Sequence, residues 1–246
     1  MKKKVVFYSN LSIAYFLLND LSDSLRLADS IVGIVSELEK NPKTALIVDQ
    51  PAEVFSNLAV FYLMKGGDHI PTSANFFVRA EKAIKLQKHT AHKSLLPVLN
   101  NLAIFHHSQK NVQETKKAME ELSSAIKREK TKKPLYLLNL AALLHKQGDS
   151  EGALKIITGL KTLADSEEGT LYFDLEMLKR LFLLSSLCHA KIKKLVEFEK
   201  DMKGYRELLA PADEDPLSHA KADRMFAIGL LKLGCVDRAK KILESY

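Results

Sequence analysis

The chain has 246 residues, of which 46% are hydrophobic and 27% are charged, a composition that indicates a globular fold and excludes a large disordered segment. Two cysteines are too few for a disulfide-stapled secreted domain, and no run of 18 apolar residues is present that could cross a membrane. The formal net charge of +7 is mildly basic and leaves protein, nucleic acid and acidic lipid open as partners.

The N-terminal segment, residues 5–38, is expected to form the first of a series of similar helical hairpins. It contains a tripeptide of Asn, Leu and a small residue that returns at intervals of about 38 to 47 residues, four times in full and twice in weaker form. The copies are Asn10-Leu11-Ser12, Asn57-Leu58-Ala59, Asn101-Leu102-Ala103, Asn139-Leu140-Ala141, Leu183-Leu184-Ser185 and Met225-Phe226-Ala227. A sequence period in this range indicates an array of repeats.

Residues 1–18 also show the basic start and apolar stretch of a signal peptide. The apolar stretch is interrupted by Ser9, Asn10 and Ser12, and no small-residue cleavage motif follows it. Because the same segment supplies the first copy of the tripeptide, we interpret it as a helix.

Six hairpins are predicted, over residues 5–38, 52–88, 96–129, 134–165, 178–210 and 220–246. The fourth is the clearest: Pro134 is suited to a helix start, apolar residues then recur at three- and four-residue steps, and Gly148-Asp149 forms the turn before a second helix. In the second hairpin the turn is expected to be extended, from Gly66 through Ser73. In the fifth, the second helix is expected at residues 194–209.

The small residue of the tripeptide has a packing role. Helix axes approach to about 8–10 Å only where the side chains at the contact permit it. We therefore expect these small residues to lie where the two helices of a hairpin meet, at Ser12, Ala59, Ala103, Ala141, Ser185 and Ala227.

Residues 137–154, which read LLNLAALLHKQGDSEGAL, resemble a tetratricopeptide repeat (TPR). The shared features are a Leu-small pair in the first helix, Gly-Asp at the turn and Ala in the second helix; Phe226-Ala227, Gly234 and Ala239 match again. Several units run past the family length, most lack its final proline, and unit two has an insertion. The resemblance implies an all-α fold, a single domain over residues 1–246 that forms a right-handed α-solenoid of about six antiparallel hairpins.

In TPR proteins the first helix of each hairpin lines a concave groove, and the position before the Leu points into it. The resemblance therefore places four asparagines in a groove: Asn10, Asn57, Asn101 and Asn139. An Asn amide both donates and accepts, so it can pair with the backbone of an extended peptide, although it can equally bridge water or adjacent helices. The same register places Ile13, Phe16, Leu17, Val60, Leu63, Met64, Ile104, His107 and His145 in the groove.

An exposed apolar stripe in such a groove would suit an amphipathic helix or an apolar linear motif. The alternative is that a loop between repeats, such as residues 41–50, covers the stripe. Some TPR proteins bind chaperone tails through a clamp of asparagines and basic residues. We do not expect that clamp here, because Asn57 is the only one of its residues that is present.

The sequence thus predicts a non-catalytic interaction scaffold or adaptor, as a subunit of a larger complex, whose protein partner is an extended peptide or amphipathic helix. One alternative is a helical-repeat RNA-binding protein that uses its lysine-rich surface, for example residues 127–133 and 191–194. Another is an architectural subunit that joins neighbours, or a second copy of itself, through the solenoid ends.

No catalytic residue, metal site or cofactor is expected. His89 and His92 could share a helix face, and His106 adjoins His107, but neither pair has a Cys or carboxylate at ligand spacing. Two cysteines without a CxxC motif favour a reducing compartment, and we expect a cytoplasmic protein.

Overall fold

The computed structural model of the protein describes residues 21–40, 51–87, 95–129, 133–209 and 215–244. Within these ranges the regular elements are all helices, which confirms the predicted all-α class. The chain divides into two compact units, unit 1 (Met1–Glu129) and unit 2 (Lys130–Tyr246). None of the described helices is both long and apolar enough to cross a membrane.

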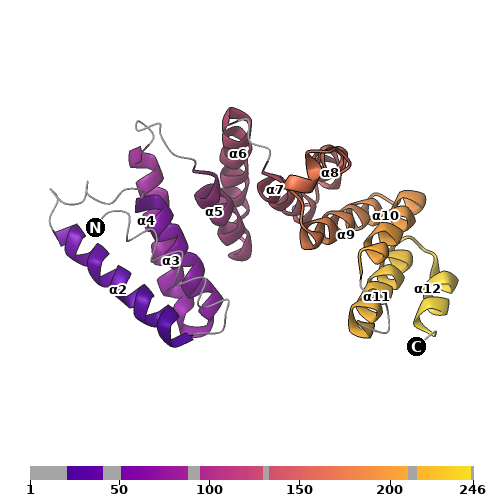
Figure 1. Cartoon of the computed structure of the whole chain (residues 1–246), viewed down its shortest axis with the longest axis horizontal. Coiled ribbons are helices and arrows are strands. Elements are labelled where there is room, and N and C mark those ends of the chain that lie inside the picture. The colour runs from indigo at the N-terminus through magenta and orange to yellow at the C-terminus, as the bar shows by residue number, and fades with distance from the viewer. Residues whose placement is uncertain (1–20, 41–50, 88–94, 130–132, 210–214, 245–246) are drawn as a thin grey trace. The chain divides into compact units, whose positions relative to one another are not determined.

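Within the residues that the structure describes, unit 1 contains two helical hairpins, preceded by a longer helix (Figure 1). Its elements are α2 (Leu21–Lys40), α3 (Pro51–Lys65), the 3-10 turn η2 (Gly67–His69), α4 (Ile70–Gln87), α5 (Leu96–Ser108) and α6 (Val112–Glu129). Helix α3 pairs with α4, and α5 with α6, while α5 also contacts both helices of the preceding hairpin. The stacked rings of Phe77 on α4 and Phe105 on α5, with centroids 4.3 Å apart, join the two hairpins.

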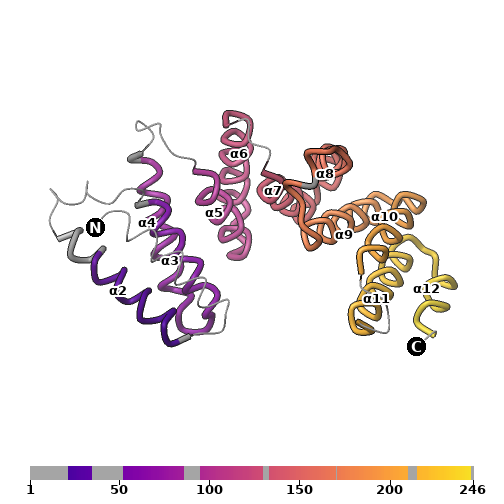
Figure 2. Tube along the Cα trace, in the orientation of Figure 1, coloured from indigo at the N-terminus to yellow at the C-terminus, as the bar shows by residue number. Residues whose placement is uncertain are grey.

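The described part of unit 2 contains three hairpins in succession, which end with the yellow helix α12 in Figure 2. Its elements are α7 (Pro134–Lys146), α8 (Ser150–Ala164), the 3-10 turn η3 (Gly169–Leu171), α9 (Leu175–Lys191), α10 (Leu195–Glu207), α11 (Pro216–Lys232) and α12 (Val236–Leu243). The first helices α7, α9 and α11 contact one another in chain order, and α8 and α10 each contact the first helix of the next hairpin. Each hairpin thus packs mainly on its sequence neighbours.

The turns that close the hairpins share a residue with a positive φ. A residue with positive φ follows the first helix each time, namely Gly66, Lys110, Gly148, Lys193 and Gly234. After α7, for example, the Asp149 N–H donates to the Leu144 carbonyl (2.9 Å) and the Gly148 N–H donates to the His145 carbonyl (3.0 Å). This is the Schellman pattern, which satisfies carbonyls at the end of a helix. Asp149 then caps α8 by accepting from the Gly152 N–H at 2.8 Å.

The expectation of an extended turn through Ser73 in the second hairpin is wrong. Helix α4 begins at Ile70, directly after η2. Pro71 lies in its first turn, where a helix needs no N–H donor and the fixed φ of proline is already helical. Ser73 is buried, and its hydroxyl donates to the Ala59 carbonyl of α3 at 2.7 Å.

The small residue of the tripeptide is buried in every hairpin that the structure describes. Ala59, Ala103 and Ala141 have no exposed surface, and Ser185 and Ala227 have almost none. In unit 2 the surrounding core is formed by larger apolar residues of both helices, such as Leu138, Ile157, Leu160, Leu181, Phe198, Met202 and Leu230. The first copy of the tripeptide, with Ser12, lies outside the described residues.

Candidate functional site

In unit 1 the predicted groove residues lie on the adjacent first helices α3 and α5. Asn57, Val60 and Leu63 are partly buried, whereas Met64 retains 37% of its surface. On α5, Ile104 is 39% exposed, while Asn101 and His107 are partly buried. Large apolar side chains at these places are therefore accessible on two neighbouring helices. The remaining predictions, Asn10, Ile13, Phe16 and Leu17, lie outside the described residues.

Asn101 has partners within the chain. Its amide nitrogen donates to the Ser56 hydroxyl of α3 at 3.0 Å, and its amide oxygen accepts from Asn100 at 3.2 Å. The amide nitrogen therefore links α5 to α3, which is the helix-bridging use, while the amide oxygen is bonded within α5.

Asn139 occupies the corresponding position on α7 in unit 2. Its amide oxygen accepts a hydrogen bond of 2.8 Å from Arg180, which lies on the adjacent first helix α9. In both units, then, an asparagine before the Leu-small pair links one first helix to the next. The repeated residue has a clear structural use, so a binding role has to rest on the side chains around it.

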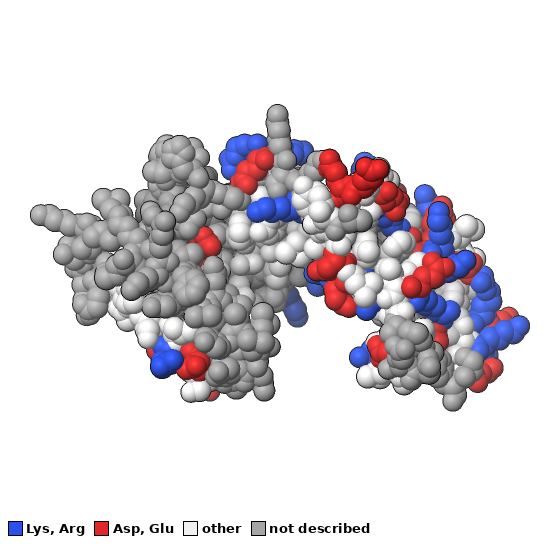
Figure 3. Space-filling view, in the orientation of Figure 1, with Lys and Arg blue, Asp and Glu red and all other residues white. Residues whose placement is uncertain are grey.

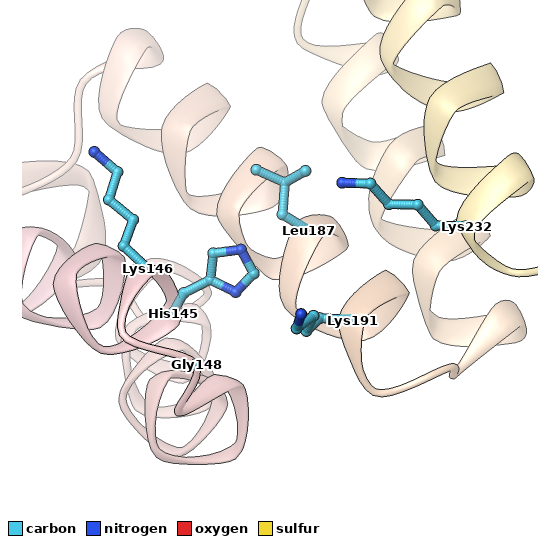
Figure 4. Close-up of a pocket in the computed structure, with 6 residues that line it drawn as sticks. All are labelled: His145, Lys146, Gly148, Leu187, Lys191 and Lys232. Carbon is cyan, nitrogen blue, oxygen red and sulfur yellow. The ribbon is translucent and has the colours of Figure 1, made fainter.

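His145, the remaining predicted groove residue, lines a pocket of about 270 Å³. The pocket lies at the C-terminal ends of α7, α9 and α11, whose last turns supply its basic residues (Figure 4). It is lined by His145, Lys146, Gly148, Leu187, Lys191 and Lys232. In Figure 4 Lys232 extends from α11 toward Leu187 of α9, and the His145 ring points toward α9 as well.

The local structure explains why lysines occur there. The C-terminal end of a helix has a negative partial charge that favours cations in its last turn. Gly148 takes a positive φ at the end of α7 and contributes no side chain to the wall of the pocket. Carbonyls at these helix ends already accept N–H groups of the turns, for example Leu144 from Asp149 and Leu230 from Cys235. The lysine ammonium groups therefore dominate the field in the pocket.

The His145 imidazole responds to that field. Burial lowers its pKa, and the positive charges of Lys191 and Lys232 lower it further. Its Nδ1 lies 3.0 Å from the Ser150 hydroxyl and 3.4 Å from the Cys188 sulfur. In the tautomer in which the Ser150 hydroxyl donates to Nδ1, Nε2 carries the hydrogen of the neutral ring.

The Cys188 thiol is not a reactive group. The residue has no exposed surface, and burial, with a smaller effect of the Asp201 charge, raises its pKa to about 12. A thiol must ionise to become a nucleophile, so the close Cys188–His145 pair is a packing contact and not a catalytic dyad.

Sequence reasoning missed a polar cluster between the hairpins of unit 2. The buried Asp201 carboxylate of α10 lies 2.8 Å from His189 Nδ1 of α9, and it also accepts a hydrogen bond from the Lys161 ammonium of α8. Lys161 donates a further hydrogen bond of 2.9 Å to Ser185. A signal was present in the sequence, because Asp201 falls on the apolar stripe of its helix between Phe198 and Met202.

Comparison of the chain with known protein families and with characterised proteins finds no match. The repeated hairpins are therefore supported by the period in the sequence and by the contacts between the helices.

Proposed function

We propose that this protein is a non-catalytic interaction scaffold, a right-handed TPR-like α-solenoid that holds a protein partner along the surface of its first helices. The partner segment is an extended peptide or an amphipathic helix, and the protein acts as an adaptor subunit of a larger complex. Two free cysteines, one of them fully buried, suit a reducing compartment, and we propose the cytoplasm.

The observation that carries the proposal is the exposure of Met64 and Ile104 on two helices that contact each other. These exposed apolar side chains lie on α3 and α5, which contact each other as the first helices of successive hairpins. Apolar anchors that repeat on neighbouring helices are what an amphipathic helix or apolar motif needs. Because Asn101 is engaged with Ser56 and Asn100, we assign the affinity to the apolar side chains and not to an asparagine ladder.

The surface charge favours a protein partner over RNA. On the face of unit 2 visible in Figure 3, acidic and basic side chains are interspersed. A nucleic-acid surface would instead gather its lysines and arginines and set aromatic side chains among them for base stacking. Binding to a protein partner through apolar anchors should depend only weakly on salt.

The test is affinity capture with the full chain and two matched double variants of unit 1. Met64→Asp/Ile104→Asp places charges on the first helices α3 and α5. Val78→Asp/Val112→Asp makes the same change at apolar residues of the second helices, which are 49% and 71% exposed. We expect a salt-resistant protein that binds the wild type and the second variant and is lost from the first.

Circular dichroism and thermal unfolding would first establish that both variants are folded. The captured protein would then be purified, and its dissociation constant measured for each variant. Equal affinities for all three chains would exclude the first-helix surface. Recovery of RNA alone, released by about 0.5 M salt, would support the nucleic-acid alternative instead.

A further inference from the structure

We propose that the pocket formed by His145, Lys191 and Lys232 binds a phosphate group on a phosphorylated serine or threonine of the protein partner. The inference rests on the proposed function, because it assigns the pocket to a segment of that partner. It adds a chemical requirement, since the partner would be recognised only in its phosphorylated state.

The first argument is the convergence of positive charge. Lys191 and Lys232 come from different first helices, and both charges act on the imidazole of His145 from a third. No aspartate or glutamate lines the pocket. Among the residues that the structure describes, Lys146, Lys191 and Lys232 have no carboxylate within 4.0 Å. An anion that enters the pocket therefore meets ammonium groups without displacing an internal partner.

The second argument is the orientation of His145. Its Nδ1 lies beside Ser150 and Cys188, so Nε2 is the ring nitrogen left for a ligand, and it donates in the tautomer in which Ser150 donates to Nδ1. Two ammonium groups and an imidazole N–H offer three charged or polarised donors around one small volume. A phosphate has three terminal oxygens that accept strong hydrogen bonds and carries nearly two negative charges at neutral pH.

The third argument separates phosphate from other anions. A carboxylate is best recognised by the planar fork of arginine, and the pocket lining contains only lysines and a histidine, which surround an anion as point charges. Nucleic acid is disfavoured because the only ring in the lining is His145, which is half-buried, so bases would find no stacking platform. Leu187 provides an apolar side that suits the carbon atoms of the partner's side chain.

The pocket lies on the same class of helix, the first helix of each hairpin, as the surface to which we assign the partner in unit 1. Its lining residues come from α7, α9 and α11, the first helices of unit 2, and from the turn after α7. Lys146 stands apart from Lys191 and Lys232, since its charge is not one of those that lower the His145 pKa. We expect Lys191 and Lys232 to hold the phosphate and Lys146 to contribute less.

The experiment is an NMR titration of the full chain, observed at the His145 imidazole. The probe is the peptide Gly-Gly-phosphoserine-Gly-Gly with blocked ends, compared with the Ser and Glu versions of the same peptide and with hexauridylate. His145→Gln identifies the resonance. We expect a saturable shift with the phosphopeptide and none with the Ser peptide, together with an increase in the His145 pKa, because a bound dianion favours the imidazolium form.

Two double variants remove the same net charge. Lys191→Gln/Lys232→Gln should weaken phosphopeptide binding by about tenfold or more, because it removes both charge-assisted donors. Lys155→Gln/Lys221→Gln removes exposed lysines of α8 and α11 that do not line the pocket, and it should change the affinity by less than about twofold. All of these lysines are exposed, so the variants are expected to fold.

Several results would overturn the inference. They are the absence of a shift at about 10 mM phosphopeptide, equal weakening by both double variants, equal binding of the Glu peptide, and tighter binding of hexauridylate through the same lysines. The two proposals can fail separately. If Met64→Asp/Ile104→Asp loses the partner but the wild-type chain does not bind the phosphopeptide at His145, the proposed function stands and this inference is rejected. If the wild-type chain binds the phosphopeptide but Met64→Asp/Ile104→Asp still captures the partner, the phosphate site stands and the first-helix scaffold is rejected.

Discussion

Asn101 on α5 donates a hydrogen bond of 3.0 Å to the hydroxyl of Ser56 on α3, so one member of the repeated Asn-Leu-small tripeptide ties two successive first helices together. Ser56 is almost completely buried and Asn101 is partly buried. The link therefore lies between the helices, beside the apolar surface to which binding is assigned.

Replacing Ser56 should lower stability without touching that surface. Ser56→Ala leaves the Asn101 amide without this acceptor, and we expect a loss of about 1 kcal/mol in the free energy of unfolding. Ser124→Ala, at an exposed position of α6, should change it by less than about 0.5 kcal/mol. Urea unfolding of Ser56→Ala, Asn101→Ala and the double variant measures the coupling. If the losses of the two single variants add up to the loss of the double variant, the hydrogen bond contributes nothing to the free energy of unfolding.

The Asp201 carboxylate should be the most sensitive polar group in unit 2. It is 3% exposed and interacts with both Lys161 and His189, so Asp201→Ala would leave two partly buried side chains without their partner. We expect a loss of about 3–5 kcal/mol in the free energy of unfolding. Glu197→Ala, at an exposed position of the same helix, serves as the control. A loss below about 1 kcal/mol for Asp201→Ala would mean that water replaces the carboxylate easily.

Two helical glycines should respond to alanine in opposite directions. A Cβ at Gly229 of α11 would overlap the ring of Phe198, which is fully buried on α10 and has no room to withdraw. Gly229→Ala should therefore destabilise the protein by about 1–3 kcal/mol. At the exposed Gly159 of α8 no atom lies within 4 Å of the added carbon. Gly159→Ala should stabilise by about 0.5–1 kcal/mol through helix propensity. Thermal unfolding of the two variants measures both signs.

The two cysteines should differ widely in reactivity. Burial raises the pKa of Cys188 to about 12, whereas Cys235 is partly exposed. At pH 8 a thiol-specific reagent should label Cys235 at least about 100 times faster, because burial keeps the Cys188 thiol protonated and out of reach of the reagent. Mass spectrometry of the labelled peptides gives the two rates. Comparable rates in the native protein would show that Cys188 becomes exposed through local opening of α9.

The lowered pKa of His145 makes stability depend on pH. In the unfolded chain an imidazole titrates near its ordinary value of about 6.5. Between that value and the lower folded pKa the unfolded chain holds more protons, so the free energy of unfolding should rise with pH through this window. Below the folded pKa both states are protonated and the His145 contribution to the slope disappears.

Urea unfolding of wild type and His145→Gln between pH 5 and 8 isolates that contribution, since the other titrating groups are shared. Cys188, Lys191 and Lys232 face the ring, and burial keeps the Cys188 thiol protonated throughout this range. We expect the wild-type curve to be steeper. Parallel curves would mean that His145 titrates alike in the folded and unfolded chains.

The all-α fold could be predicted because the apolar period and the Leu-small pair recur in each hairpin, and Ala59, Ala103 and Ala141 are buried as that pattern requires. The turn after α9 could not, because Lys193 takes there the left-handed conformation that glycine takes at Gly148. The N–H groups of Lys193 and Lys194 donate to carbonyls in the last turn of α9. These hydrogen bonds hold the turn in place without a glycine.

The candidate site was less accessible to prediction. His145 could be assigned to the surface from its register on the first helix. Lys191 and Lys232 meet it only because three helix ends converge, and this depends on how successive hairpins pack. The same holds for Asp201 and Lys161, whose positions in the sequence give no indication that they pair.

The cluster around Asp201 also bears on cooperativity. In an array where each hairpin contacts only its neighbours, a terminal hairpin can open by itself at little cost. Lys161, His189 and Asp201 belong to α8, α9 and α10, which are parts of two hairpins. Separation of those hairpins exposes a broken ionic cluster as well as apolar surface. The amide protons of α8, α9 and α10 should therefore exchange with solvent as one group, and more slowly than those of α12.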